Sequence, residues 1–327
     1  MRFALLLAMV FAGIGPLSAE PAKVIFDTDM YSDFDDVGAL ACLHALADAG
    51  ECEILATIAN TRNTLAVAMC EIVNAYYGRP EIPVGCTKEI GFEAPGDRVN
   101  VGCYGPAVKK YARWARHLNS SDAPDAAEVY RRVLAAQPDK SVVICSVGFL
   151  SNLRKLVESD RELVSRKVKL WVAMACNYPK GHEYNSMTDW RSSKIALENW
   201  PTPVIFTDFQ YGMDCYAGRV LTEVGNSPVA EVFRSNLGAC NGAGGRSAWD
   251  ETAVLIAVRG VERYFNAHRG TFRMVGEDGA DEWLADEERG AHVRVTEKVN
   301  KLEVAKVIDE LMLRAPRHAP DCGWLKP

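Results

Sequence analysis

Near the start of the chain, five aspartates occur within ten positions: Asp27, Asp29, Asp33, Asp35 and Asp36. They follow the apolar run 24–26, which has the composition of a buried strand. In an open parallel sheet, ligands bind outside the carboxyl ends of the strands, where this loop falls. Carboxylates packed there repel one another unless a cation or hydrogen-bond donors compensate. Oxygen ligands without Cys or His suit Ca²⁺ or Mg²⁺ better than zinc. The cluster therefore predicts a site for metal or phosphate chemistry.

The same aspartates also have a simpler interpretation, because Asp33 or Asp35 could cap the helix that follows. Two enzyme classes open with a comparable pattern. A haloacid-dehalogenase-type phosphatase has Asp-x-Asp-x-Thr/Val after an apolar strand, but here Tyr31 is at the fifth position and no convincing Lys and Asp-Asp pair follow. The inosine–uridine-preferring nucleoside hydrolase family opens with Asp-x-Asp-Pro-Gly-x-Asp-Asp. The chain resembles this second pattern, with Met30-Tyr31 in place of Pro-Gly and two extra residues before Asp35-Asp36.

Four later stretches match motifs of the same family in the same order, so that the resemblance runs from about Lys23 to Arg259. Each alone would also fit an ordinary turn, loop or core residue. The stretch 56–60 ends in Ala-Asn where the family has Gly-Asn, and the stretch 143–153 contains Gly-Phe-Leu-Ser-Asn where the family has Gly-Pro-Leu-Thr-Asn. Asn177, Glu183 and Asn185 have the family's Asn-x₅-Glu-x-Asn spacing. The stretch 249–254 begins with Trp-Asp-Glu-Thr-Ala where the family has His-Asp-Pro-Leu-Ala.

The resemblance implies a Ca²⁺-dependent enzyme that hydrolyses the N-glycosidic bond of ribonucleosides or related N-ribosides, releasing base and ribose. By position in the motifs, Asp29, Asp36 and Asp250 would be carboxylate ligands of the ion, and Val147 would offer its backbone carbonyl. A bound metal lowers the pKa of water, and Asp29 would then take the proton of that water as the catalytic base.

The resemblance also implies a set of residues that hold the sugar through hydrogen bonds: Asp35, Asn60, Asn177, Glu183 and Asn185. Such bonds favour the flattened, positively charged sugar of the transition state. Trp249 stands where members of the family have a His that helps the base leave, and an indole N–H cannot act as an acid near neutral pH. We expect Trp249 to stack on the base or line the sugar pocket. The leaving group then needs no acid, or another residue protonates it, or the substrate is not a common nucleoside. The two-residue insertion leaves open whether Asp33 takes the role given to Asp35.

Alternation of strands and helices over nearly two hundred residues predicts how these side chains are positioned. Buried strands are expected at 24–26, 54–58, 82–85, 142–145, 168–175 and 204–206. Helices are expected at 37–49, 65–77, 126–136 and 191–199, with Thr64 and Ser151 as N-caps. Such βαβ units indicate an α/β fold with a mostly parallel, Rossmann-like central sheet and helices on both faces.

After Gly212 the pattern changes. Helices are expected at 229–237, 250–259 and 303–314, short edge strands at 271–275 and 292–295, and a Gly-rich loop near the site at 236–246. No fixed-period repeat and no linker divides the chain. We therefore predict one domain over residues 20–327.

The first nineteen residues, Met1–Ala19, have the features of a secretory signal: Arg2, the apolar run 3–14, and the small residues Ser18 and Ala19. The run is too short to span a bilayer. We therefore expect an exported protein, periplasmic or secreted, without membrane attachment after cleavage.

The overall composition fits a soluble enzyme that acts on a small molecule. Apolar residues make up 48% and charged residues 24%, which excludes intrinsic disorder. With a net charge of −6, the chain lacks the excess of basic residues that is typical of a nucleic-acid-binding protein. The expected partner is a nucleoside or riboside, and the family resemblance favours a homo-oligomer.

All ten cysteines follow the predicted signal. Four of them fall within apolar patterns typical of core residues: Cys42, Cys70, Cys145 and Cys176. The better disulfide candidates are in loop-like sequence: Cys86, Cys103, Cys215, Cys240 and Cys322.

Two other functions remain open from the sequence. Trp249 in place of the family's His is compatible with a Ca²⁺-dependent ribose or glycoside-binding protein with little or no catalysis. The opening Asp-x-Asp pattern leaves the haloacid-dehalogenase-type phosphatase as the third hypothesis.

Overall fold

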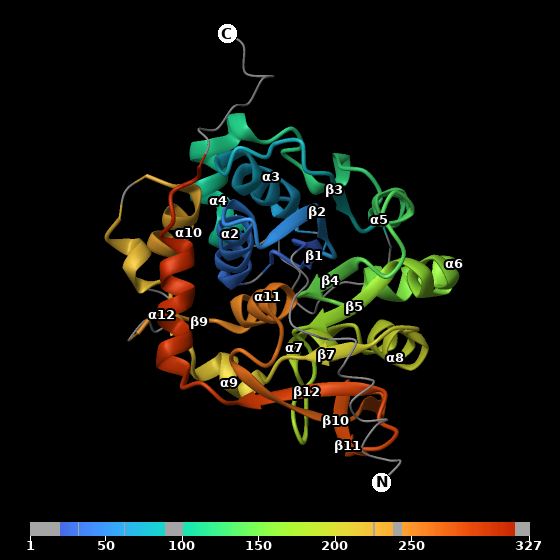
Figure 1. Cartoon of the computed structure of the whole chain (residues 1–327). Helices are drawn as coiled ribbons and strands as arrows, with labels where there is room; N and C mark the ends of the chain where they lie inside the picture. The colour runs from blue at the N-terminus through green and yellow to red at the C-terminus, as the bar shows by residue number, and fades with distance from the viewer. Residues whose placement is uncertain are drawn as a thin grey trace.

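The centre of the molecule is a ten-stranded sheet with the order β3-β2-β1-β4-β5-β7-β12-β10-β11-β6 (Figure 1). The structure is a computed structural model that describes residues 20–31, 33–61, 63–88, 101–224, 226–237 and 244–317, so the predicted signal lies outside the described residues. The strands of the sheet are β1 (Ala22–Thr28), β2 (Cys52–Ala59), β3 (Val84–Cys86), β4 (Val142–Ser146), β5 (Val168–Ala173), β6 (Lys180–Gly181), β7 (Val204–Phe206), β10 (Phe265–Val275), β11 (Ala280–Ala285) and β12 (His292–Glu297).

Helices cover both faces of this sheet, as predicted (Figure 1). One face carries α2 (Asp35–Asp48), α3 (Ala66–Tyr76), α4 (Val101–Tyr111), α10 (Pro228–Asn236), α11 (Trp249–Arg259) and α12 (Lys301–Met312). The other carries α5 (Ala126–Ala135), α6 (Ser151–Lys167) and α8 (Trp190–Asn199). The short helices α7 (Tyr184–Thr188) and α9 (Phe209–Asp214) and the small β8 (Tyr216–Ala217) and β9 (Arg246–Ser247) sheet complete the α/β domain. Within the described ranges, no helix has the length and apolar character needed to cross a membrane.

Strand β1 shows why an uninterrupted apolar run predicts a central strand. Val24 and Phe26 pack into the core beneath α2, α3 and α11, whereas Ile25 packs into the core beneath α5, α6 and α8. All three side chains are fully buried. Because successive side chains of a strand point to opposite faces, both faces must be covered to bury them.

Parallel pairing aligns the carboxyl ends of the strands that position the site. Strand β1 pairs in parallel with β2 and β4, and β4 pairs in parallel with β5. The register places Thr28 opposite Ala59, and Ser146 opposite both Asp27 and Ala173. The residues that directly follow these four strands therefore lie side by side at the carboxyl ends of the strands: Asp29, Asn60, Val147 and Met174.

Strands form at both C-terminal positions predicted, 271–275 and 292–295, but the prediction that they are edge strands is wrong. Strand β10 has eleven residues and lies between β12 and β11, and β12 lies between β7 and β10. The sheet's edges are β3 and β6 instead. Strand β12 pairs in parallel with β7 and antiparallel with β10. The side chains of β10 and β12 are only partly buried, and this half-exposed pattern resembles that of an edge strand.

Neither predicted N-cap residue caps its helix. Helix α3 is preceded by Leu65 and α6 by Leu150, and neither position makes a side-chain capping bond. Thr64 lies one residue too early, and Ser151 is already the first residue of α6. In α3, the Val67 amide of the first turn donates instead to the hydroxyl of Ser120, a distant residue, at 3.1 Å.

The disulfide candidates within the described residues are core thiols instead. Cys86, Cys103 and Cys215 are buried, and no disulfide joins two cysteines of the described ranges. The thiols of Cys86 and Cys215 donate to backbone carbonyl groups at 3.3 and 3.5 Å. Cys240 and Cys322 lie outside the described residues.

Candidate active site

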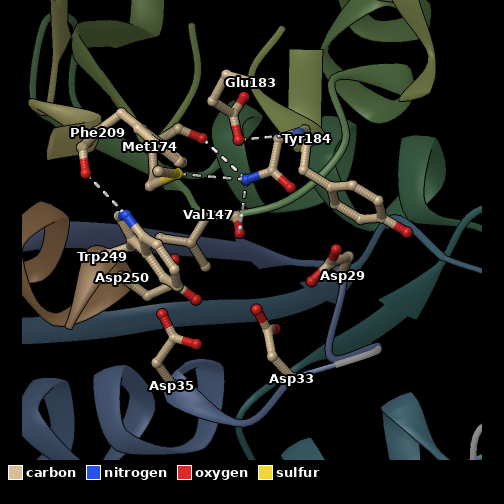
Figure 2. Close-up of a pocket in the computed structure, with 11 residues that line it drawn as sticks. Asp29, Asp33, Asp35, Val147, Met174, Glu183, Tyr184, Phe209, Trp249 and Asp250 are labelled. Carbon is tan, nitrogen blue, oxygen red and sulfur yellow. Dashed lines mark hydrogen bonds between the residues drawn. The ribbon is translucent and has the colours of Figure 1, made fainter. Parts of the chain in front are cut away.

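A pocket of about 250 Å³ lies where the carboxyl ends of β1, β4 and β5 meet (Figure 2). Figure 2 shows Asp33 and Asp35 on one side of it and Glu183 on the opposite side. The predicted site residues that line it are Asp29, Asp35, Val147, Glu183, Asn185, Trp249 and Asp250. The other residues that line it are Asp33, Met174, Tyr184 and Phe209.

The loop after β1 gathers the carboxylates. Carboxylate oxygens of Asp29, Asp33 and Asp36 all lie within 4.8 Å of one another. Two hydrogen bonds fix the carboxylate of Asp36: its Oδ1 accepts from the Thr28 hydroxyl and from the Met30 amide, the latter at 3.1 Å. An all-oxygen donor set of this kind suits a hard divalent cation.

Met30 adopts a φ of 41°, in the left-handed region that residues other than glycine rarely occupy. This is one of the two positions where the chain departs from the family's Pro-Gly. The turn at Met30 lets its amide face the carboxylate of Asp36.

Helix starts bring further carboxylates to the same place. Asp35 and Asp36 occupy the first turn of α2, and Asp250 occupies the first turn of α11. The amino terminus of a helix carries partial positive charge, which favours anionic side chains there. Two helices that pack against each other thus aim their first turns at the pocket.

Burial and mutual repulsion raise the pKa values of these groups. Burial raises the pKa of Asp29 well above its ordinary value, and the charges of Asp36 and Asp33 raise it further. Burial, with the charge of Asp35 next, has the same effect on the pKa of Asp250. Burial raises the pKa values of Asp35 and Asp36 to about 6. A bound divalent cation would reverse these shifts, since it favours the ionised carboxylates.

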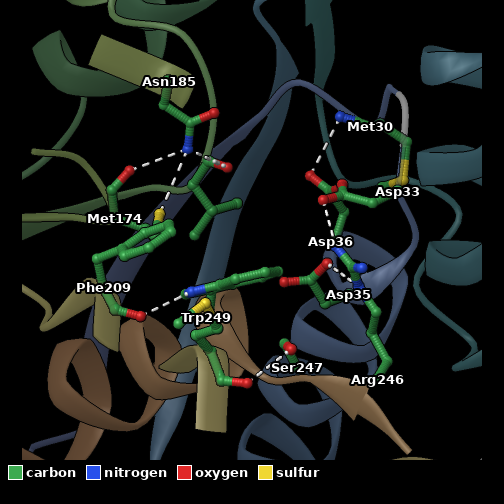
Figure 3. Close-up of polar contacts among 12 residues, drawn as sticks. Met30, Asp33, Asp35, Asp36, Met174, Asn185, Phe209, Arg246, Ser247 and Trp249 are labelled. Atoms are coloured by element: carbon green, nitrogen blue, oxygen red, sulfur yellow. Dashed lines mark hydrogen bonds and ion pairs between the residues drawn. The ribbon is translucent and has the colours of Figure 1, made fainter. Parts of the chain in front are cut away.

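Arg246 places a positive charge beside the acidic loop (Figure 3). Its Nε donates to Asp35 Oδ1 at 3.0 Å, and its Nη2 donates to Asp33 Oδ2. The guanidinium also lies 4.9 Å from the ring centroid of Trp249 and 5.4 Å from that of Phe34. The end of the stretch 236–246, predicted to lie near the site, therefore reaches it through Arg246.

Gly148 explains how the backbone of Val147 comes close to the acidic loop. A Cβ atom at Gly148 would lie 2.3 Å from the Asp29 amide nitrogen and 2.8 Å from Asn60 Oδ1. Only glycine permits this approach. The Val147 amide donates to the Asp27 carbonyl at 2.8 Å, and the Val147 carbonyl lies at the pocket.

Glu183 and Asn185 line the pocket from α7. Glu183 caps this helix, accepting hydrogen bonds from the Asn185 amide at its Oε1 and from the Ser186 amide at its Oε2, both at 2.9 Å. The Asn185 Nδ2 donates to the carbonyls of Val147 and Met174 at 3.3 and 3.0 Å. Burial raises the pKa of Glu183 to about 7.

Asn60 does not line the pocket, contrary to its predicted position against the sugar. Its Nδ2 donates to Asp27 Oδ1 at 2.6 Å, and its Oδ1 accepts from the Phe149 amide at 3.0 Å. Asp27 is fully buried and also accepts hydrogen bonds from Tyr130 and Asn152. The side-chain amide of Asn60 thus links Asp27 in β1 to the backbone of Phe149 after β4.

Asn177 also lies outside the pocket lining. Its amide donates to Asp281 Oδ1 at 2.8 Å, and its side chain packs against Gly181. His182, beside Glu183 in the sequence, is half exposed and lies 3.2 Å from Asp278 instead of in the pocket. The Asn-x₅-Glu-x-Asn motif therefore brings its last two members to the site.

Aromatic side chains form one wall of the pocket. Phe209 and Trp249 stack with ring centroids 5.6 Å apart and an interplanar angle of 24°. The Trp249 indole N–H donates to the Phe209 carbonyl at 2.8 Å. Tyr184, which follows Glu183 on α7, is 40% exposed and also lines the pocket.

Phe209, Tyr184 and Met174 were not predicted to line the site, and Arg246 was predicted only as the end of a loop near it. The predicted strand 168–175 included Met174, but β5 ends at Ala173, and Met174 is the next residue. The other three are placed by helix and loop geometry that spacing along the chain does not reveal.

Comparison with known proteins finds a matching family and similar folds. A sequence profile of the family described as inosine-uridine preferring nucleoside hydrolase matches residues 24–310. A search of curated protein sequences finds no match to the chain.

Solved structures similar to the chain include an inosine-guanosine nucleoside hydrolase, with a TM-score of 0.70 and 18% identity over 89% of this chain and 98% of that one. An inosine-uridine preferring nucleoside hydrolase from Bacillus anthracis has a TM-score of 0.68 and 14% identity, covering 89% of this chain and 99% of that one. The type III effector protein XopQ, solved with adenosine diphosphate ribose, has a TM-score of 0.70 and 14% identity over 97% and 99% of the two chains. At these identities the likeness shows a shared fold.

Proposed function

The chain belongs to the inosine-uridine preferring nucleoside hydrolase family, which makes it an N-glycosyl hydrolase of the nucleosidase type, and from this premise we propose a Ca²⁺-dependent hydrolysis of N-ribosides. One observation carries the proposal. The acidic loop, the carboxyl end of β4 and the start of α11 contribute Asp29, Val147 and Asp250 to a single pocket, with the carboxylate of Asp36 next to that of Asp29.

The donor set fits a calcium ion. The ion would be held by the carboxylates of Asp29, Asp36 and Asp250 and by the carbonyl of Val147. The Val147 carbonyl already accepts a hydrogen bond from Asn185, but it keeps a second lone pair for the ion. When bound, the ion lowers the pKa of a water molecule and accepts sugar hydroxyl groups as ligands.

The residues of the chain supply the remaining chemistry. Asp29 accepts the proton of the attacking water at its carboxylate, which a bound divalent cation keeps ionised. Asp35 and Asn185 line the same pocket and bind the ribose hydroxyl groups. Asn185 does so through its Oδ1, because its Nδ2 donates to backbone carbonyl groups of the protein. The carboxylates around the sugar stabilise the positive charge that develops at C1′.

The test is hydrolysis of inosine and uridine by the purified protein, with and without EDTA, measured as release of reducing sugar. We expect release that stops with chelator and returns with Ca²⁺. The Asp250→Ala variant should lose on the order of 10³-fold in turnover. The matched control Asp139→Ala removes an exposed carboxylate far from the pocket lining and should keep full activity.

Other outcomes would favour the alternatives. Ribose binding without sugar release would make the protein a Ca²⁺-dependent binder. Phosphate release from p-nitrophenyl phosphate that survives Asp250→Ala would favour a phosphatase, because that mechanism gives this position no fixed role.

We also propose that the protein is exported. The support is the signal-like sequence Met1–Ala19. Expression of the full chain followed by cell fractionation and N-terminal mass analysis should give a product that begins at Glu20 outside the cytoplasm. A full-length cytoplasmic product would contradict export.

A further inference from the structure

Trp249 presents its ring, and not its N–H, to the pocket. The indole N–H is bonded to the Phe209 carbonyl at 2.8 Å. The backbone of Gly212 holds the ring in place, since a Cβ atom there would lie 2.4 Å from Trp249 Cδ1. The side chain at this position therefore contributes an aromatic surface to the pocket wall.

Glu183 is also committed to the protein. Its Oε1 accepts from one backbone amide, and its Oε2 accepts from the amides of Ser186 and Cys176 at 2.9 and 3.2 Å and from the Ser186 hydroxyl at 3.1 Å. Oxygens that accept this many hydrogen bonds serve a carboxylate better than a proton donor. Above about pH 7, the pKa to which burial raises it, Glu183 adds negative charge to the pocket wall.

Carboxyl groups make up most of the polar lining of the pocket. Its lining includes five carboxyl side chains: Asp29, Asp33, Asp35, Glu183 and Asp250. Arg246, next to the pocket, is paired with two of them. When a doubly charged ion is added, the ionised carboxylates still outnumber the positive charges. A cleft lined by one sign of charge concentrates ligands of the opposite sign and repels those of the same sign.

The aromatic wall is already used to hold a planar cation. The Arg246 guanidinium lies 4.9 Å from the centroid of Trp249. Trp is the best cation–π partner, and flat cations stack on it readily. Phe209 and Tyr184 extend the aromatic lining of the pocket.

Resting on the proposed hydrolase function, we propose that the preferred substrates are N-ribosides whose aglycone ring carries a positive charge, such as N-ribosylpyridinium compounds. Water oxygen forms the bond to C1′ while the C1′–N bond breaks. Both electrons of that bond go to the ring nitrogen, which leaves as part of a neutral molecule. The proton of the water goes to Asp29 and then to solvent. A neutral purine or pyrimidine, in contrast, leaves as an anion unless it is protonated.

The test compares four ribosides with the Ca²⁺-loaded protein: N-ribosylnicotinamide, its 5′-phosphate, inosine, and neutral p-nitrophenyl riboside, which needs no acid. Each kcat/KM is divided by the spontaneous hydrolysis rate of the same compound. We expect the cationic riboside to exceed inosine by about 100-fold or more, the usual contribution of a general acid. Its KM should be about tenfold below that of p-nitrophenyl riboside, and the 5′-phosphate should be a poor substrate because of charge repulsion.

Variants separate the contributions. Trp249→Phe should raise KM for the cationic riboside about three- to tenfold and affect p-nitrophenyl riboside less, because phenyl is a weaker cation–π partner. Asp278→Asn, an exposed control outside the pocket lining, should change neither. Inosine cleaved as well as the cationic riboside would overturn the preference while the hydrolase function stands. Loss of that inosine cleavage in Tyr184→Phe would identify the acid responsible. A folded protein that cleaves no riboside would contradict the proposed function itself.

Discussion

Calcium binding to the acidic loop should release protons, because burial raises the pKa values of Asp35 and Asp36 to about 6. Without the ion, these carboxyls hold protons in the folded state at pH values where the unfolded chain has lost them. Their contribution to folding stability is present at about pH 4 and is lost as the pH rises through about 6. Calcium requires the ionised form, so its affinity rises over the same window.

The magnitude follows from the titration. A group with a pKa of about 6 is protonated roughly tenfold over ionised at about pH 5 and the reverse at about pH 7. One displaced proton therefore strengthens calcium binding about tenfold between these pH values, and two displaced protons about 100-fold. The stabilisation that saturating calcium adds to the metal-free protein therefore grows by about 1.4 to 2.8 kcal/mol between these pH values, because the metal-free protein loses the same amount of stability.

Isothermal titration calorimetry measures both quantities. Titrations at about pH 5, 6 and 7, repeated in buffers with different ionisation enthalpies, give the Kd and the number of protons released. Asp36→Asn should lower the proton count and weaken binding, whereas the distant control Asp139→Asn should change neither. A Kd that stays constant over this range, with no proton release, would refute a calcium ion held by Asp36 next to Asp35.

Three further substitutions test how the site is supported. Tyr130→Phe removes the hydroxyl that donates to buried Asp27 at 2.7 Å, and should lower the unfolding free energy by about 1–3 kcal/mol in denaturant titrations with little change in the Ca²⁺ Kd. Gly148→Ala should displace Asp29 and reduce kcat, while circular dichroism shows an intact fold. Arg246→Met leaves two carboxylates without their guanidinium and should lower the melting temperature more in EDTA than in Ca²⁺; equal losses in both conditions would contradict this.

The part of the site that depends on strand ends was predictable from the sequence. The apolar runs before Asp29 and Val147 are visible as buried strands, and parallel pairing then fixes both residues at one edge of the sheet. The start of α11 was likewise predicted to within one residue, which placed Asp250 in a first helical turn.

The rest depends on contacts between distant segments. Arg246 reaches Asp33 and Asp35 across more than two hundred residues, and no pattern near Arg246 announces this pairing. Asn60 matched a motif, yet its amide is used by Asp27 and Phe149, because hydrogen-bond partners are decided by packing and not by spacing. The interior position of β10 and β12 was missed for the same reason, since strand order is a property of the whole sheet.

An anomalous diffraction map of crystals grown with Ca²⁺ is the most direct test of calcium binding in the pocket. We expect one strong peak there, within about 2.3–2.6 Å of carboxylate oxygens of Asp29, Asp36 and Asp250 and of the Val147 carbonyl. A map without that peak at millimolar Ca²⁺, or with the ion bound away from Asp250, would contradict this expectation.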